Sequence, residues 1–390
     1  MDHPDASKDL SVKNLLFLHP LAHLGGGEVA LYDLLTSLDG RRYRAHLVLP
    51  CEGPLSQKLR AKNISVSIIP FARGILGRYP PGLTPGAFVQ IGRLAKSLPA
   101  HLIFINDSYL CLYGGMIARW LAIPSVMASH GWWDVHFIHQ ELLHRWLGYP
   151  ILAVSEAVRQ SLLQRGLIQA VQVRRMYLGV DTERFRPASK SEAKARLGCD
   201  PQEITLTIAA RLIPRKGHDV FFEAAKIVMR DFPRLRLLVV GDKIFESFEE
   251  NDATKRQILG LVERDPELKA RTLFLGFRDD MPLVMNATDV LISSAWFETF
   301  GVAIAEAMSS CVPVVSTDVG GPNELVADGV TGFLVPPNKP DLVAAKTLEI
   351  LKNPDLVRRF GEAARARVLE HFSLDRYVAN MENFLKTLLS

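Results

Sequence analysis

Short β-rich runs and helical patterns alternate along the whole chain, and this alternation limits most strongly what the chain can fold into. In the first half, continuous apolar runs bounded by polar residues or proline are typical of buried parallel strands. They lie at 15–18, 45–49, 66–69, 102–105, 125–128 and 151–154. Between the first two runs, four leucines have the i, i+3, i+4, i+7 spacing of one helix face. They are Leu31, Leu34, Leu35 and Leu38.

The alternation starts again after Asp181. Strands are predicted at 205–209, 237–240, 272–275, 290–292 and 312–315. Two such βα halves predict an α/β protein with two Rossmann-like, doubly wound parallel-sheet domains and ligands at the carboxyl ends of the strands. We expect one domain at 1–180, a second at 181–371, and a last helix at 372–390 that docks on the fold.

Size and charge agree with a packed enzyme. A chain of 390 residues suits two domains, and 48% apolar with 23% charged residues is ordinary for a globular protein. A formal net charge of +4 is too small to predict nucleic-acid binding. The first 180 residues, however, hold 18 basic and 11 acidic side chains. Different ligands for the two halves and a merely solvated basic surface are equally good explanations of this difference.

Cysteine usage and hydropathy give expectations about location. The four cysteines are scattered without a C-x-x-C pair, which predicts reduced thiols in a cytosolic protein and neither a disulfide nor a zinc site. The first residues lack the pattern of a signal peptide, and no apolar stretch reaches the ~20 residues that span a bilayer. We therefore expect a cytoplasmic protein whose contact with the inner face of a membrane, if any, is peripheral.

Three glycines, Gly25, Gly26 and Gly27, follow the first predicted strand and begin the first helix. Backbone amides at a helix start can bind an anion. Together with Ala30, two of these glycines fit the dinucleotide fingerprint, and Glu52 could be its ribose acid. The residues between the strand and Gly25 disfavour that match, because the fingerprint needs a tight turn directly after the strand. A structural turn and a loop facing an interdomain cleft are the other interpretations.

Charged residues follow two strands of the second half. Arg211 and Lys216 follow the end of the 205–209 strand, where two cations suit a diphosphate. A solvated loop without a ligand is the structural alternative. Glu298 follows the 290–292 strand, and Glu306 lies in an apolar helical segment, where a buried carboxylate needs hydrogen-bond donors such as ribose hydroxyls. An N-cap acid and a buried ion pair are the structural alternatives for these glutamates. Free amides at the helix start could hold a phosphate; they belong to Thr299, Phe300 and Gly301.

The order of these motifs resembles the family 4 glycosyltransferases, which are retaining enzymes with the GT-B fold. The resemblance implies that the two domains face a cleft, that 1–180 is the acceptor domain and 181–371 the donor domain, and that the helix at 372–390 docks back near the first domain. The likeness rests on the R-x-x-x-x-K-G segment at 211–217, the two glutamates, and the sequence GGPNELVADGVTGFLVP at 320–336. Three segments of the first half extend it. They are GGGE at 25–28, SHG at 129–131 and VSEA at 154–157. The resemblance spans nearly the whole chain.

The resemblance implies roles for these residues. Arg211 and Lys216 would bind the donor's phosphates and offset charge on the leaving nucleotide diphosphate. Glu306 would hold the ribose and Glu298 the donor sugar, with the amides of residues 299–301 near the phosphates. The loop at Gly25 and Gly26 would close over the phosphates, and His130 would lie beside the reacting sugar. We expect no cofactor besides a nucleotide sugar as donor.

The chemistry of transfer fits this assignment. As the glycosidic C–O bond breaks, negative charge grows on the diphosphate, so fixed cations there lower the barrier. The chain has no D-x-D, so a metal-chelating pair is not evident and no metal is expected; Arg211 and Lys216 could supply the charge. Two positions depart from the usual family pattern. Leu178 stands where the family often has asparagine, which weakens the donor contact inferred from that position. Asp242 stands where another glycine is usual, in a loop near the base, which leaves UDP, GDP and ADP open as the donor nucleotide.

The acceptor is less defined. The segment 71–83 combines Arg73 and Arg78 with apolar and turn residues, and tryptophans follow His130. A lipid-linked acceptor at a membrane surface, a saccharide stacked on aromatic rings and a plain core all suit such mixtures, and we expect a saccharide or lipid-linked saccharide. Three further histidines are explained by solvent-facing helix positions. They are His136, His139 and His144.

Three other functions stay open at this point. A sugar-nucleotide epimerase of similar fold would need an acid/base pair that the sequence does not reveal. An NAD-linked oxidoreductase using Gly25 and Gly27 would leave the charged residues of the second half unexplained. A catalytically idle sugar-nucleotide binder would keep those residues without turnover.

Overall fold

The computed structural model describes residues 12–71, 84–131, 138–242 and 249–390. The chain divides into two compact units. The first comprises residues 1–154, 158–176 and 377–390, and the second comprises 155–157 and 177–376. The boundaries thus fall a few residues from the expected 180 and 371, because Val180 pairs with Ser373 in an isolated bridge and both belong to the second unit.

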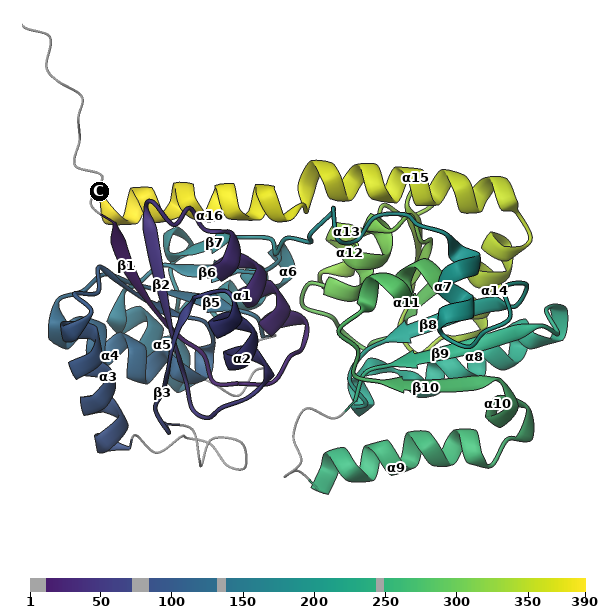
Figure 1. Cartoon of the computed structure of the whole chain (residues 1–390), viewed down its shortest axis with the longest axis horizontal. Helices are drawn as coiled ribbons and strands as arrows, with labels where there is room; N and C mark the ends of the chain where they lie inside the picture. The colour runs from purple at the N-terminus through teal and green to yellow at the C-terminus, as the bar shows by residue number, and fades with distance from the viewer. Residues whose placement is uncertain (1–11, 72–83, 132–137, 243–248) are drawn as a thin grey trace, which may run out of the picture. The chain divides into compact units, whose positions relative to one another are not determined.

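The first unit contains a seven-stranded sheet in the order β3-β2-β1-β4-β5-β6-β7, with every adjacent pair parallel (Figure 1). Its strands are β1 (Lys13–Leu18), β2 (Tyr43–Leu49), β3 (Ser65–Ile68), β4 (Leu102–Ile105), β5 (Ser125–Ser129), β6 (Ile151–Ala153) and β7 (Val173–Arg175). Its helices are α1 (Gly26–Ser37), α2 (Pro54–Ala61), α3 (Pro85–Ser97), α4 (Cys111–Leu121), α5 (Ile138–Leu147), α6 (Glu156–Leu163) and α16 (Leu374–Leu389), with short 3-10 turns η1 (Ser108–Leu110) and η2 (Ala170–Gln172).

The second unit contains a six-stranded parallel sheet in the order β10-β9-β8-β11-β12-β13. Its strands are β8 (Ile204–Ala209), β9 (Leu235–Val240), β10 (Thr272–Gly276), β11 (Val290–Ser293), β12 (Val314–Thr317) and β13 (Gly332–Val335). Its helical elements are α7 (Lys190–Arg196), η3 (Pro214–Lys216), α8 (His218–Asp231), α9 (Glu249–Glu263), α10 (Pro266–Arg271), α11 (Met281–Ala287), α12 (Val302–Ser309), α13 (Pro322–Leu325), α14 (Pro340–Leu351) and α15 (Pro354–His371).

Apolar side chains explain why these elements pack as they do. The strands β4 and β6 are buried along their whole length, as strands covered on both faces must be. In α8, the four residues with helical spacing are fully buried against the second sheet. They are Phe221, Ala224, Ala225 and Val228. The sequence pattern missed β7 and β13, and it placed β12 two residues early, because Val312 and Pro313 lie before the strand.

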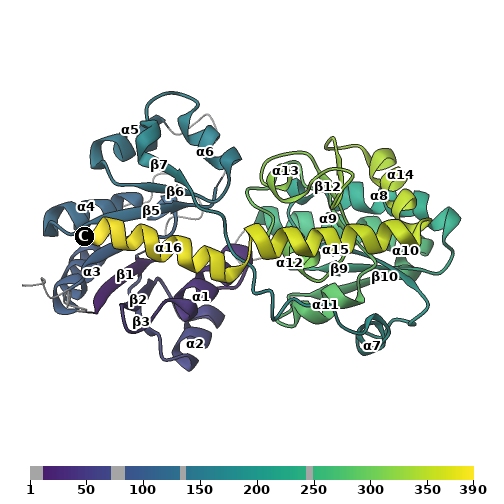
Figure 2. The ribbon, with the colours of Figure 1, turned by 90° about the horizontal axis from the view of Figure 1, so that it is seen from above.

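The last helix belongs to the first unit, although it comes at the end of the chain (Figures 1 and 2). Glu382 accepts a hydrogen bond of 2.8 Å from the backbone amide of Asp39, just before β2. The guanidinium of Arg174 in β7 lies 5.8 Å from the ring centre of Phe384. These contacts connect α16 to the sheet near β2 and at β7, which lie toward opposite ends of the strand order.

Each sheet reverses its winding at one place. In the first sheet β1 lies between β2 and β4, and in the second β8 lies between β9 and β11. The loops after β1 and β4, and those after β8 and β11, therefore leave neighbouring strand ends in opposite directions. Such a topological switch point is where open α/β sheets bind their ligands.

Candidate functional site

Two loops of the second unit are packed against each other at its switch point. Gly217 has φ of 68°, and a Cβ there would lie 2.0 Å from the carbonyl oxygen of Ser294. The Ser294 hydroxyl donates a 2.7 Å hydrogen bond to the Gly217 carbonyl, and the Trp296 amide donates one of 2.9 Å to that of Arg215. The loop after β8 is thus fixed to the loop after β11.

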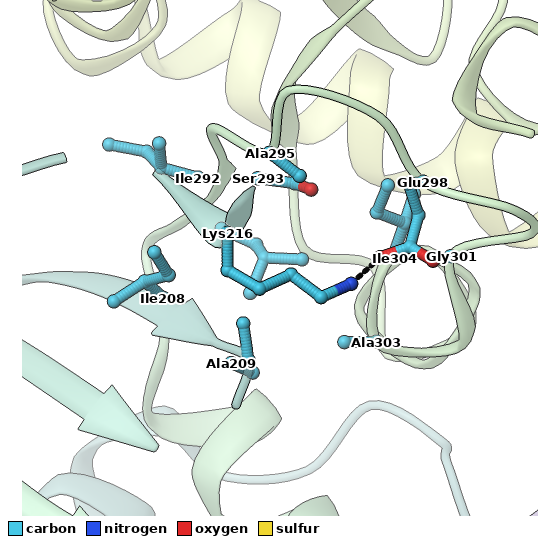
Figure 3. Close-up of a pocket in the computed structure, with 12 residues that line it drawn as sticks. Ile208, Ala209, Lys216, Ile292, Ser293, Ala295, Glu298, Gly301, Ala303 and Ile304 are labelled. Atoms are coloured by element: carbon cyan, nitrogen blue, oxygen red, sulfur yellow. Dashed lines mark hydrogen bonds and ion pairs between the residues drawn. The ribbon is translucent and has the colours of Figure 1, made fainter. Parts of the chain in front are cut away.

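This packing brings Lys216 and Glu298 together across a pocket (Figure 3). The two side chains form an ion pair and are only 14% and 20% exposed. Burial alone would raise the pKa of Glu298, but the charge and hydrogen bond of Lys216, helped by Arg211, lower it. Glu298 is therefore ionised, and the pocket is lined by one cation and one anion of the predicted site, with Arg211 near enough to act on the carboxylate.

The amino terminus of α12 forms another wall of this pocket. Gly301 is the N-cap with φ of 100°, so the helix begins at Val302 and its first-turn amides have no partner inside the helix. Gly301, Ala303 and Ile304 line the pocket. The amide of Thr299 instead donates a 3.0 Å hydrogen bond to Glu298.

Phe300 and Glu306 are buried, at 2% and 7% exposure. Phe300 packs its ring 6.1 Å from that of Phe372 and 6.3 Å from that of Tyr177. Glu306 lies in the second turn of α12, among apolar residues. Behind this segment, a Cβ on Gly321 would come within 2.5 Å of the Phe300 backbone, so the double glycine at 320–321 permits the close approach.

The first unit places a set of polar residues at its own switch point. His19 follows β1, Asn106 follows β4 and His130 follows β5. The Nε2 atom of His130 lies 3.2 Å from Oδ1 of Asn106, and Nδ2 of Asn106 lies 3.1 Å from Nδ1 of His19. Nε2 of His19 lies 3.2 Å from a carboxylate oxygen of Glu28 in α1. Burial lowers the pKa of His130 to about 4, with His19 acting in the same direction and Glu28 against it.

The predicted glycine-rich loop begins α1. Gly25 is the N-cap in an extended conformation, and Gly26 is the exposed first residue of the helix. A Cβ on Gly27 would meet no atom within 4 Å, so an approaching group would find open space there. Glu52, the ribose acid of the dinucleotide alternative, is exposed and pairs with Arg60.

One sequence interpretation is wrong. His144 does not face solvent: it is fully buried, and its Nδ1 lies 2.7 Å from the hydroxyl of Tyr149. Its helix α5 packs against α4. His136, Trp132, Trp133 and most of the 71–83 segment lie outside the described residues.

Sequence reasoning missed four polar residues near the two switch points. Asn106 and His19 belong to the hydrogen-bonded set, and both follow strands that the sequence predicted, but their meeting requires that β1 and β4 be neighbours. Burial raises the pKa of Asp107 to about 6, against a hydrogen bond from the Tyr109 amide. His218 is 1% exposed, and neither ring nitrogen has a hydrogen-bond partner in the described part of the chain.

Within the described residues, no group of three or more histidine, cysteine, aspartate or glutamate side chains could hold a metal ion. All four cysteines are free thiols. No described helix is long and apolar enough to cross a membrane.

Known proteins match both halves of the chain. The model of the family "Glycosyl transferases group 1" matches residues 189–367, and that of "Glycosyltransferase Family 4" matches residues 24–184. A D-inositol 3-phosphate glycosyltransferase of Segniliparus rotundus is 33% identical over 48% of this chain but only 41% of its own length. The Streptomyces bingchenggensis protein of the same name is 26% identical over 83% of this chain and 81% of its own.

Two further proteins extend the comparison. The UDP-Gal:alpha-D-GlcNAc-diphosphoundecaprenol alpha-1,3-galactosyltransferase of Escherichia coli is 25% identical over 65% of this chain and 67% of its own. The crystal structure of Anabaena Alr3699/HepE in complex with UDP-glucose is 23% identical, with a TM-score of 0.83 over 96% of this chain and 99% of that one. The last likeness shows the fold. The two family models together cover most of the chain in the expected order, and the chain belongs to the family 4, group 1 glycosyltransferases with the GT-B fold.

Proposed function

We propose that this chain is a retaining hexosyltransferase that takes its sugar from a nucleotide diphosphate sugar and needs no metal ion. The observation that supports it most is the Lys216–Glu298 ion pair beside Arg211 and the start of α12. Cations and helix-start amides bind and stabilise a pyrophosphate, whereas the carboxylate suits sugar hydroxyls. The membership of the chain in a glycosyltransferase family favours this function over the epimerase and NAD-linked alternatives.

Each residue has a role in this proposal. Lys216 and Arg211 stabilise the charge that develops on the leaving diphosphate, which a metal does in other transferases. Glu298 contacts the donor sugar and Glu306 the ribose. Amides of the 299–303 segment approach the phosphates; because the Thr299 amide is bonded to Glu298, those of Val302 and Ala303 are the better candidates. Gly25 and Gly26 serve the phosphates, and His130 contacts the reacting sugar.

Binding of the donor can be tested without knowing the acceptor. Thermal shift is measured with UDP, GDP, ADP and NAD, because a ligand of the native state raises its apparent stability. We expect one nucleoside diphosphate to stabilise the protein and NAD to do nothing. Stabilisation by NAD alone would reject the proposal. The nucleotide diphosphate glucose is then supplied as donor, and release of the free nucleotide is measured. Release shows an enzyme, whereas binding without release shows a catalytically idle binder.

For the acceptor we propose a saccharide carried on a lipid, used at an anionic membrane surface. The Escherichia coli relative acts, by its name, on a sugar linked to diphosphoundecaprenol. In this chain, the neighbouring helices α3, α4 and α5 expose Trp120 (58%) and Trp146 (54%). Lys96 lies 4.9 Å from the ring centre of Trp120, and Arg119 lies 5.0 Å from that of Trp146.

The charge of this face fits anionic lipid. The three helices contain a single acidic residue, Glu141, and it is buried. Their exposed described charges are all basic. They are Arg93, Lys96, Arg119 and Arg145. Tryptophan rings with adjacent cations are suited to the interface between water and lipid headgroups.

Vesicle sedimentation tests this face. We expect the protein to pellet with vesicles of phosphatidylcholine and phosphatidylglycerol, but not with phosphatidylcholine alone, and salt to weaken the binding. Trp120→Ala with Trp146→Ala should weaken it, whereas Trp296→Ala, a comparably exposed tryptophan of the second unit (47%), should not. Equal binding by both variants would reject the membrane face and favour a free saccharide acceptor.

A further inference from the structure

The proposed function uses His130 but leaves three buried neighbours without a role. His19, Glu28 and Asn106 are 3%, 8% and 4% exposed. They come from three separate elements of the first unit: the loop after β1, the first turn of α1 and the loop after β4. Burying this many polar groups is costly unless each is hydrogen-bonded, and the contacts that they make connect them in a single line to His130.

The donors and acceptors along this line determine where the protons lie. An ionised carboxylate only accepts, so Nε2 of His19 donates to Glu28 over 3.2 Å. A neutral imidazole has one N–H, so Nδ1 of His19 accepts from the Asn106 amide nitrogen over 3.1 Å. The Asn106 carbonyl oxygen is then left to accept from Nε2 of His130 over 3.2 Å.

His130 is thereby left with a lone pair on its other ring nitrogen. No residue in the described part of the chain forms a hydrogen bond with Nδ1 of His130. Asn106 determines the tautomer of His130, because its amide group donates only through nitrogen, accepts only through oxygen and does not transfer protons. If that amide were flipped, its nitrogen would donate to Nε2 of His130, and the ring proton of His130 would lie on Nδ1 instead. Both ring nitrogens of His19 would then have to carry protons.

We propose that Glu28, His19 and Asn106 are positioning residues that hold His130 as the neutral Nε2–H tautomer, so that Nδ1 accepts a hydrogen bond from a hydroxyl of a substrate sugar. This inference rests on the proposed role of His130 in sugar binding. The choice of tautomer decides whether the ring offers an acceptor or a donor to the sugar, and the wrong tautomer inactivates a catalytic histidine even when its position is kept.

The tautomer can be measured without any substrate. Nitrogen-15 spectra of the histidine-labelled full chain report which ring nitrogen carries the proton, and His130→Gln identifies the signal. We expect His130 to be protonated at Nε2 in the wild type. Asn106→Leu removes the acceptor and should give a mixture of tautomers. Asn106→Asp still accepts from Nε2 and should keep the wild-type form.

A matched control separates positioning from stability. Asn286 is a buried asparagine of the second unit that bonds the backbone of Ala188 and Arg186, so Asn286→Leu also removes buried hydrogen bonds. Both leucine variants should lower the melting temperature. Only Asn106→Leu should change the tautomer of His130 and lower kcat for release of nucleotide from its glucose ester, by about 10- to 100-fold with KM little changed. Asn106→Asp should restore part of kcat.

The outcomes are distinguishable. A wild-type His130 protonated at Nδ1, or an Asn106→Leu variant that keeps the wild-type tautomer, overturns the inference whatever the enzyme's substrate. If the tautomers behave as expected but His130→Gln retains full activity, the proposed role of His130 in sugar binding fails, and the positioning of its tautomer has no use in catalysis.

Discussion

The two units have the same topology at their switch points but opposite chemistry. β1 and β4 of the first unit correspond in order and direction to β8 and β11 of the second. In the first unit the loops after these strands bring together the imidazole of His19 and the amide of Asn106. His19 also contacts Glu28, and Asn106 also contacts His130. In the second unit they bring together the cation of Lys216 and the carboxylate of Glu298.

The difference shows what the fold determines and what it leaves to the side chains. A parallel sheet determines where loops from distant parts of the sequence meet. The side chains then decide between a pocket lined by full charges, which suits a pyrophosphate, and a set of imidazole and amide groups bonded to one buried carboxylate, which suits sugar hydroxyls. Four expected outcomes test this contrast.

The largest effect is expected from Lys216→Ala. Removing the ammonium takes away charge stabilisation at the leaving diphosphate, and losing one such group commonly lowers kcat by about 100- to 1000-fold. Initial rates of nucleotide release measure it. Lys226→Ala is the control, because Lys226 pairs with Glu223 on the surface of α8 in the same unit. Equal activity of the two variants would remove Lys216 from the site.

Glu298→Gln should separate binding from turnover. In the free protein Glu298 holds Lys216, so neutralising it releases the ammonium toward phosphate. We expect the Kd for UDP, or for whichever nucleotide stabilises the protein, to fall by roughly fivefold, as for an ion pair of about 1 kcal/mol. Turnover should fall about tenfold or more, because a contact to the sugar is lost. Weaker nucleotide binding would contradict the idea that the two residues compete in this way.

Asp107→Asn tests whether burial disfavours the charge of the Asp107 carboxylate in the first unit. The folded-state pKa of Asp107, about 6, lies above its value in an unfolded chain, so the folded state binds more protons and stability falls as pH rises from about 4 to 6. Asparagine still accepts from the Tyr109 amide but has no charge to bury. We expect it to stabilise the first unit by about 1–3 kcal/mol at pH 8, and not at pH 4.

Calorimetry at the two pH values checks this sign, and Asp39→Asn is its counterpart. The hydrogen bond from Arg41 lowers the pKa of Asp39, so its charged form is favoured on folding and its stabilisation is lost as pH falls. The asparagine variant should therefore reduce stability at pH 8. The same sign for both variants would show that burial does not disfavour the Asp107 charge.

The sequence was enough to predict most of the strands in their order, because alternating apolar runs and helical faces are local patterns; it missed β7 and β13. It was also enough to bring Arg211, Lys216 and Glu298 to one site, since each follows a predicted strand and the family motif joins them. The sequence could not predict the hydrogen bonds that connect Glu28 to His130. They form because β1 and β4 are neighbours in the sheet, and this pairing cannot be read from their distance in the sequence. His144 was misjudged because polarity was taken as exposure.

The smallest effect concerns His218, which contrasts with the buried histidines of the first unit. His19 has hydrogen bonds at both ring nitrogens, whereas the buried ring of His218 has none within the described residues. Burial and the charge of Lys216 lower the pKa of His218 to about 4. The unfolded chain therefore binds more protons between pH 6.5 and 4, and this residue costs stability as pH falls through that range.

Replacing a buried, unpartnered polar group by an apolar one of similar shape is neutral or stabilising, so His218→Phe should raise the stability of the second unit by about 1 kcal/mol at pH 7, and by more at pH 5. His19→Phe should do the reverse at pH 7, because it leaves Glu28 and Asn106 with unsatisfied groups. Calorimetric melting of both variants compares the two units directly. A loss of stability in His218→Phe as large as that in His19→Phe would mean that the ring of His218 has a partner in solution, and the contrast between a connected and an unconnected buried histidine would not hold.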